Sequence, residues 1–139
     1  TNDGVHWMAL PSPQMVPGIG GEVGAVEYIR YGPGLSRGAY YAILGSGMHM
    51  ITYNASSVTG PWHRGVKNWE VLNGAHSCYF ARFFWSTAIN GSYELLVTHQ
   101  TFSHVGRTYV APFKRALVDE EGTLRFGWWE KNENLKGPE

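Results

Sequence analysis

Nowhere in this chain do apolar residues recur at a helical spacing over eleven or more residues without a glycine or proline between them. The 18 glycines and 7 prolines are spread along all 139 residues, so they act as punctuation and do not mark a disordered block. Between them lie short runs rich in tyrosine, phenylalanine, tryptophan, valine and isoleucine, which suit a pleated, half-buried surface. The sequence therefore predicts an all-β fold.

Seven strands are expected from these runs. They cover Val23–Ile29, Ala39–Leu44, Met48–Asn54, Ser77–Trp85, Tyr93–Gln100, Arg107–Asp119 and Thr123–Trp129. Pro112 interrupts the sixth run, because proline lacks the backbone N–H that a central strand uses. Asn90-Gly91 and the segment Asp119–Gly122 are typical of hairpin turns. The pattern favours antiparallel strands with meander-like connections.

The strand pattern repeats along the chain. The runs Tyr40–Leu44 and Tyr93–Val97 begin 53 residues apart, and so do the strand positions Ala25 and Cys78. A period near 50 that holds about four short strands predicts the antiparallel four-stranded blades of a β-propeller. An antiparallel sandwich has hairpins at similar spacings and is the alternative.

The repeat also predicts how the chain is divided. Residues 1–17 would end a preceding blade, 18–72 and 73–129 would each form a blade, and 130–139 would start the next connection. At 53 residues a blade the chain holds between two and three blades, whereas a closed propeller has at least about four. We therefore expect a partial five-bladed propeller, a fragment that lacks the first blade or blades.

Composition excludes several classes of protein. The 11 basic and 11 acidic side chains balance, which argues against a nucleic-acid partner because such proteins carry a basic excess. A single cysteine excludes an internal disulfide framework and a multi-cysteine zinc site. The longest apolar stretches are too short to span a membrane. The predicted partners therefore include neither nucleic acid nor membrane.

Two polar residues fall where a propeller would place its site. The innermost strand of each blade starts near the central channel, and Glu22 and His76 lie just before two such strands, 54 residues apart. A carboxylic acid on a glycine-flanked backbone can approach a ligand closely and act as a general acid or base. A solvated loop glutamate and a structural histidine are the alternatives. Glu27 is a second candidate carboxylate, although its place inside Val23–Ile29 favours an exposed strand face.

Metal and thiol chemistry are not indicated. His49, His99 and His104 share no metal-ligand spacing. Cys78 lies in an apolar run and is expected to be a small core residue, not a nucleophile.

Six tryptophans invite a sugar-stacking interpretation, because an aromatic face matches the apolar face of a sugar ring. Trp7, Trp62 and Trp69 fall beside turns and are expected to pack blades together instead. Trp128 and Trp129 are adjacent in a strand, so their rings should point to opposite faces.

Several motifs resemble those of the five-bladed β-propeller glycoside hydrolases of families 32 and 43. Asn2–Trp7 resembles their DGxxW strand end, Tyr40–Ser46 resembles their YYLxYS strand, and Ser56–Trp62 is similar to their SxxxGPW ending. The later segments Tyr109–Lys114, Asp119–Gly122 and Trp128-Trp129 look like late blades of family 32-like relatives. Together the motifs cover nearly the whole chain.

The resemblance implies a carbohydrate substrate, a β-fructofuranoside or an arabinofuranoside or xyloside. It implies Glu22, in Glu22–Val26, as the general acid, with Glu27 as the fallback, although Gly24 stands where the family has proline. It also implies that His76, in Gly74–Ser77, helps to form the sugar site. No cofactor is implied, but there is room for a structural cation such as calcium beside His76.

The chain also departs from the family. Glycoside hydrolysis uses two carboxylates, and neither the first-blade carboxylate nor the RDP-like aspartate of these enzymes is present. We therefore expect a glycosidase when the protein is full length, and no activity from the isolated chain. A non-catalytic carbohydrate-binding or interaction propeller and an unrelated structural β-domain are the alternatives. The triplets Asn54-Ala55-Ser56 and Asn90-Gly91-Ser92 are compatible with secretion but leave the compartment open, as the sequence leaves the oligomeric state.

Overall fold

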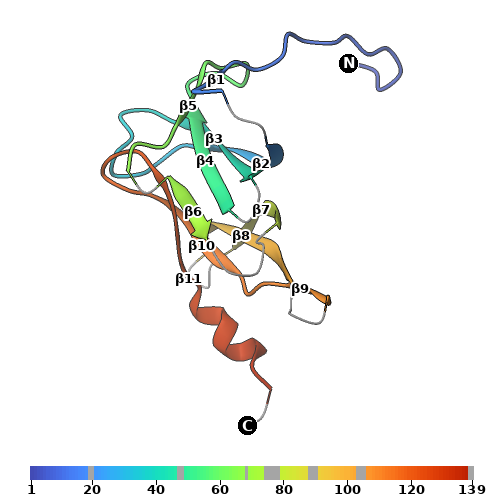
Figure 1. The fold of residues 1–139 in the computed structure, drawn as a ribbon. Helices are drawn as coiled ribbons and strands as arrows, with labels where there is room; N and C mark the ends of the chain where they lie inside the picture. The colour runs from blue at the N-terminus through green and yellow to red at the C-terminus, as the bar shows by residue number, and fades with distance from the viewer. Residues whose placement is uncertain are drawn as a thin grey trace.

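The computed structural model describes residues 1–18, 21–46, 49–67, 69–73, 79–87, 91–102 and 106–137. Within these residues, one short helix accompanies eleven strands in two separate sheets (Figure 1). The prediction of an all-β chain with largely antiparallel sheets is therefore confirmed. No helix in the described part of the chain is long and apolar enough to cross a membrane.

The first sheet is built from the first half of the chain. Its strands are β1 (Met15–Val16), β2 (Glu22–Ile29), β3 (Ala39–Ser46), β4 (His49–Ala55), β5 (Trp62–Arg64) and β6 (Glu70–Asn73). The strand order is β1-β5-β4-β3-β2. β6 lies off this path and also pairs with β4. β2, β3 and β4 form an antiparallel meander, whereas β1 pairs with β5 in parallel.

The second sheet repeats the meander. Its strands are β7 (Tyr79–Thr87), β8 (Tyr93–Phe102), β9 (Thr108–Val110), β10 (Lys114–Val118) and β11 (Leu124–Trp128). The order is β11-β10-β8-β7, with β9 also paired to β8. All these pairings are antiparallel. The 3₁₀ helix η1 (Glu130–Leu135) follows and projects beyond the sheet (Figure 1).

The main core lies between the two sheets. Strand side chains alternate between faces, so Tyr41 and Ile43 of β3 face the core that also includes Leu95, Val97 and Leu124 of the second sheet. On the other face of β3, a second cluster packs around Tyr53 and Trp62, with Ala42, Leu44, Ile51 and Ala55. β3 is therefore buried on both faces, which agrees with its continuous apolar sequence.

The turn between β10 and β11 joins the sheets. The carboxylate of Asp119 accepts hydrogen bonds from the backbone N–H groups of Glu121 and Thr123 and from Nε of Arg125 at 2.7–2.9 Å. The hydroxyl of Tyr41, in the first sheet, donates to the Gly122 carbonyl at 2.7 Å. The predicted turn is confirmed, but Asp119 organises its backbone and is not simply a solvated charge.

Several predicted boundaries change. The run Arg107–Asp119 forms two strands, β9 and β10, on either side of Pro112. The pattern missed β1, β5 and β6, which have two to four residues each, and the helix η1. Met48, Ser77 and Cys78 lie outside the described residues.

The tryptophans beside turns behave differently. Trp62 is 3% exposed and donates its indole N–H to the carbonyl of Val58. It is a core residue, but its buried neighbours all belong to the first sheet, so it packs within one sheet and not between two. Trp7 is 78% exposed on the N-terminal segment, which reaches away from the sheets (Figure 1). The prediction that Trp7 packs blades together is wrong, because no strand of the described residues covers this segment.

Candidate functional site

The candidate site lies where the first strands of the two meanders begin. β2 and β7 contact each other, and a Cβ atom on Gly24 would stand 3.3 Å from the backbone nitrogen of Ala81. Glycine therefore allows the close approach of these two strands. The guanidinium of Arg82 donates to the carbonyl of Gly24 and, at 2.8 Å, to the carbonyl of Ala81. We call the end of the sheets at which β2 and β7 begin the Glu22 rim.

Glu22 is the first residue of β2 and is exposed at this rim. It pairs with Gly45 of β3, and a Cβ atom on the preceding Gly21 would stand 2.8 Å from the Gly45 carbonyl oxygen. The residue before the strand thus lies on backbone that only glycine fits. Beside Glu22 is a shallow hollow lined by residues of both sheets, too small to hold a water molecule. The hollow does not by itself accommodate a sugar ring.

The other strand carboxylates lie too far from Glu22 to act with it. Glu27 is five residues further along β2, about 16 Å away at 3.3 Å a residue. Glu70 lies three strands across the sheet, about 14 Å away at 4.8 Å a strand. Glu94 is the second residue of β8, at the opposite end of the sheets. The carboxyl groups of glycosidases lie about 5 to 9.5 Å apart. Among the described strands, Glu22 is therefore a single carboxylate.

The sequence did not single out His49 or Arg82 for the rim. His49 opens β4, and the register places it two strands from Glu22, with its Nδ1 atom 3.6 Å from a carboxylate oxygen of Glu70. Its position directly after a glycine-containing turn in the sequence was the signal that could have placed His49 at this end of the sheet. Arg82 follows a β-bulge at which Phe80 has a φ of +48°, a strained conformation for a bulky residue. No sequence pattern marks that bulge.

His76, the second predicted site residue, lies outside the described residues. Its role in shaping a sugar or cation site stays a prediction. Within the described part of the chain, no group of three or more histidine, cysteine, aspartate or glutamate side chains is arranged to hold a metal ion.

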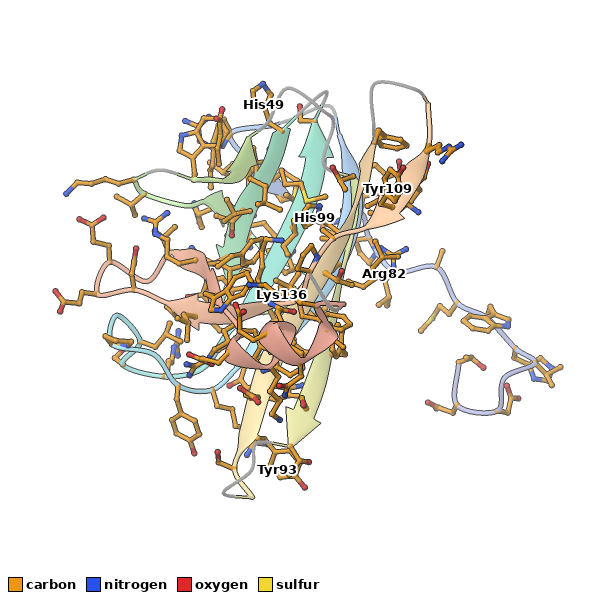
Figure 2. The ribbon with its side chains drawn as sticks, turned by 90° about the horizontal axis from the view of Figure 1, so that it is seen from below. His49, Arg82, Tyr93, His99, Tyr109 and Lys136 are labelled. Atoms are coloured by element: carbon orange, nitrogen blue, oxygen red, sulfur yellow. The ribbon has the colours of Figure 1, made fainter. Side chains whose placement is uncertain are left out.

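A larger pocket opens at the opposite end of β2 and β7, with a volume of about 680 Å³. Figure 2 shows how far apart the two ends are, with His49 at one end of the sheets and Tyr93, from the pocket, at the other. Its walls carry four aromatic side chains, those of Tyr28, Tyr31, Trp85 and Tyr93. The pocket, not the rim, has the volume of a ligand site, which is roughly 300 to 1,000 Å³.

His99 is the buried histidine of the described residues. Its Nδ1 atom lies 2.9 Å from the carbonyl oxygen of Gln100, and its Nε2 lies 3.0 Å from the ammonium of Lys114. These partners require the tautomer in which Nδ1 donates and Nε2 accepts. Burial lowers the pKa of His99, and the positive charge of Lys114 lowers it further. His99 therefore joins β8 to β10 as a neutral structural residue.

No family model, curated protein or solved structure matches this chain. The function must therefore be argued from the residues at the two ends of the sheets.

Proposed function

We propose that the two sheets are neighbouring blades of a β-propeller that acts on carbohydrate, with Glu22 as the general acid of glycoside hydrolysis. The observation that carries the proposal is the contact between β2 and β7, the edge strands of the two sheets. Gly24 approaches Ala81, and four residues later on both strands Tyr28 and Trp85 line one pocket, so the two strands run side by side in the same direction. The innermost strands of adjacent propeller blades have this relation.

In this proposal Glu22 protonates the glycosidic oxygen as the bond to the anomeric carbon breaks. A second carboxylate must then attack that carbon or activate a water molecule. Since the carboxylates of the first sheet's strands lie about 14 Å or more from Glu22, this group comes from outside the described strands. Arg82, fixed on the backbone of β2, would bind sugar hydroxyl groups beside the acid.

Chemical rescue tests the assignment of the acid. Formate, in place of the missing carboxylate, is supplied to the chain with phenyl arabinofuranoside, phenyl xyloside or a fructoside. The poor leaving groups require protonation, so formate-dependent cleavage should fall at least about tenfold in Glu22→Gln. Glu27→Gln is the matched control on the same strand and should keep the activity. If Glu27→Gln abolishes cleavage and Glu22→Gln does not, the assignment of Glu22 is wrong.

A non-catalytic carbohydrate-binding protein is the second candidate. The observation that favours it is that the pocket of ligand size lies away from Glu22 and is lined with aromatic side chains. Glycan binding without formate-dependent cleavage of any of the three substrates would favour this candidate over the hydrolase.

A further inference from the structure

The pocket at the far end of the sheets has the chemistry of a separate ligand site. Its floor is formed by Ile29, Leu95 and Ala116, which are between 6% and 8% exposed and belong to the main core. The two sheets contribute facing walls, one from the end of β2 and the other from β7, β8 and β10. A ligand there would lie in a wedge between the sheets, the kind of interface where ligand pockets form.

The walls offer flat aromatic surfaces. Tyr31 and Tyr93 are 84% and 76% exposed, and Trp85 is 50% exposed. Tyr28 is more constrained: its ring lies 4.9 Å from that of Tyr40, and its hydroxyl occupies the space where a side chain on Gly38 would stand, 2.3 Å away. The Tyr28 ring is therefore fixed against the first sheet, and the exposed aromatic surfaces open to a ligand are those of Tyr31, Trp85 and Tyr93.

The charges around the pocket do not balance. Arg30 and Arg115 contribute two positive charges and Glu94 one negative charge, so the lining has a net charge of +1. Glu94 lies 3.9 Å from Arg115 and 3.6 Å from Lys131, which lies outside the lining. Arg115 also lies 4.0 Å from Glu130. Arg30 is the charged residue of the lining that forms no ion pair with a carboxylate of the described residues. Its guanidinium is therefore suited to an anionic ligand.

We infer that this pocket binds an acidic sugar, a glycan whose ring carries a carboxylate. The apolar C–H face of the ring lies against Trp85 and the tyrosines, and the carboxylate pairs with Arg30. A purely apolar ligand would leave the guanidinium of Arg30 desolvated without a partner, whereas Arg115 and Glu94 already form ion pairs. The inference is independent of the hydrolase proposal, because the pocket shares no residue with the Glu22 rim.

Titration calorimetry with trigalacturonate and its fully methyl-esterified form tests this inference. The ester keeps the rings and removes the charges, so the acid should bind more tightly by roughly threefold to tenfold. Arg30→Gln should remove that preference and leave the binding of the ester unchanged. Trp85→Ala should weaken both ligands by about fivefold, since it removes a stacking surface. Arg37→Gln removes another exposed arginine, outside the lining, and should change neither.

Three results with the sugar ligands would overturn the inference, and a fourth comes from benzoate. The first three are equal binding of acid and ester, the same loss in Arg37→Gln as in Arg30→Gln, and no binding of trigalacturonate at millimolar concentration. Benzoate, which also combines a ring with a carboxylate, must bind more weakly than trigalacturonate, or the site belongs to aromatic acids. Glu22→Gln should leave the affinity unchanged, so failure of the hydrolase proposal and failure of the acidic-sugar site can be distinguished.

Discussion

The contact between Tyr41 and Gly122 gives a sharp test of how the two sheets are held together. Tyr41 is 1% exposed in the core of the first sheet, and its hydroxyl reaches the turn that ends β10 in the second. Tyr41→Phe removes one oxygen atom and leaves the rest of the packing intact. The variant therefore reports on this single hydrogen bond between sheets.

The expected loss can be worked from the contact. A hydrogen bond contributes about 1 kcal/mol net, and an unpartnered buried carbonyl adds to the loss. Since Gly122 is half-buried, water can replace part of the bond, so the free energy of unfolding should fall by about 1 to 2 kcal/mol at pH 7. Urea unfolding followed by circular dichroism measures this difference.

The same residue makes the difference depend on pH. Burial, and to a smaller extent the negative charge of Asp119, together raise the pKa of Tyr41 to about 12. Because the folded-state pKa lies above the unfolded value near 10, the protonated tyrosine stabilises the fold fully below pH 10. That contribution is lost between about pH 10 and pH 12, by about 2 to 3 kcal/mol at 1.36 kcal/mol a unit.

Wild type and Tyr41→Phe should therefore become equally stable near about pH 11, and the variant should be the more stable protein above that pH. Tyr40→Phe is the matched control, because the Tyr40 ring packs against Tyr28 at 4.9 Å on the other side of the strand. It should change stability by less than about 0.5 kcal/mol. Equal stabilities of wild type and Tyr41→Phe at pH 7, or a constant difference up to pH 11, would refute the reasoning.

Two further variants test the same junction by thermal and urea unfolding. Gly34→Ala should cost at least about 3 kcal/mol, because the new Cβ atom would stand 2.2 Å from the backbone nitrogen of Gly122, whereas Gly137→Ala, which has open space, should cost less than about 0.5 kcal/mol. Asp119→Asn should cost about 1 to 2 kcal/mol at pH 7 through the weakened contact with Arg125. Burial alone would raise the pKa of Asp119, but its hydrogen bonds and Arg125 hold it below the usual value, so this difference should vanish once the pH has fallen through that lowered pKa. If the difference in stability persists below that pKa, the loss comes from the altered shape of the side chain and not from its lost charge.

The long strands could be predicted because their sequences carry their own signal. The run that became β3 is apolar on both faces, and β8 begins with a similar run. β1, β5 and β6 have two to four residues, too few for any period to appear, and they form because a longer strand offers hydrogen-bond partners. Trp62 and Trp7 both lie near turns, but only Trp62 has strands around it. Local sequence does not contain that difference.

The two ends of the sheets were predictable to different degrees. The repeat predicted Glu22 at the start of a strand, and the structure has it as the first residue of β2; that β2 is the inner strand of a blade stays a prediction. The pocket at the opposite end is assembled from four segments between residues 28 and 117, at the end of β2, the end of β7, the start of β8 and the middle of β10. None of these segments carries a recognisable motif, so only their meeting in space reveals the site.

The two proposed activities make different demands on this chain. A general acid needs a substrate, a second carboxylate and a site from which water is excluded. Glu22 is exposed on a rim with no ligand-sized hollow, so catalysis would require further groups over that rim. The pocket at the opposite end needs no addition, because both its walls, its floor and its charges come from the described strands and the residues next to them. Binding of an acidic glycan can therefore be measured on these 139 residues alone, whereas the hydrolase proposal needs formate or additional protein to supply the missing carboxylate.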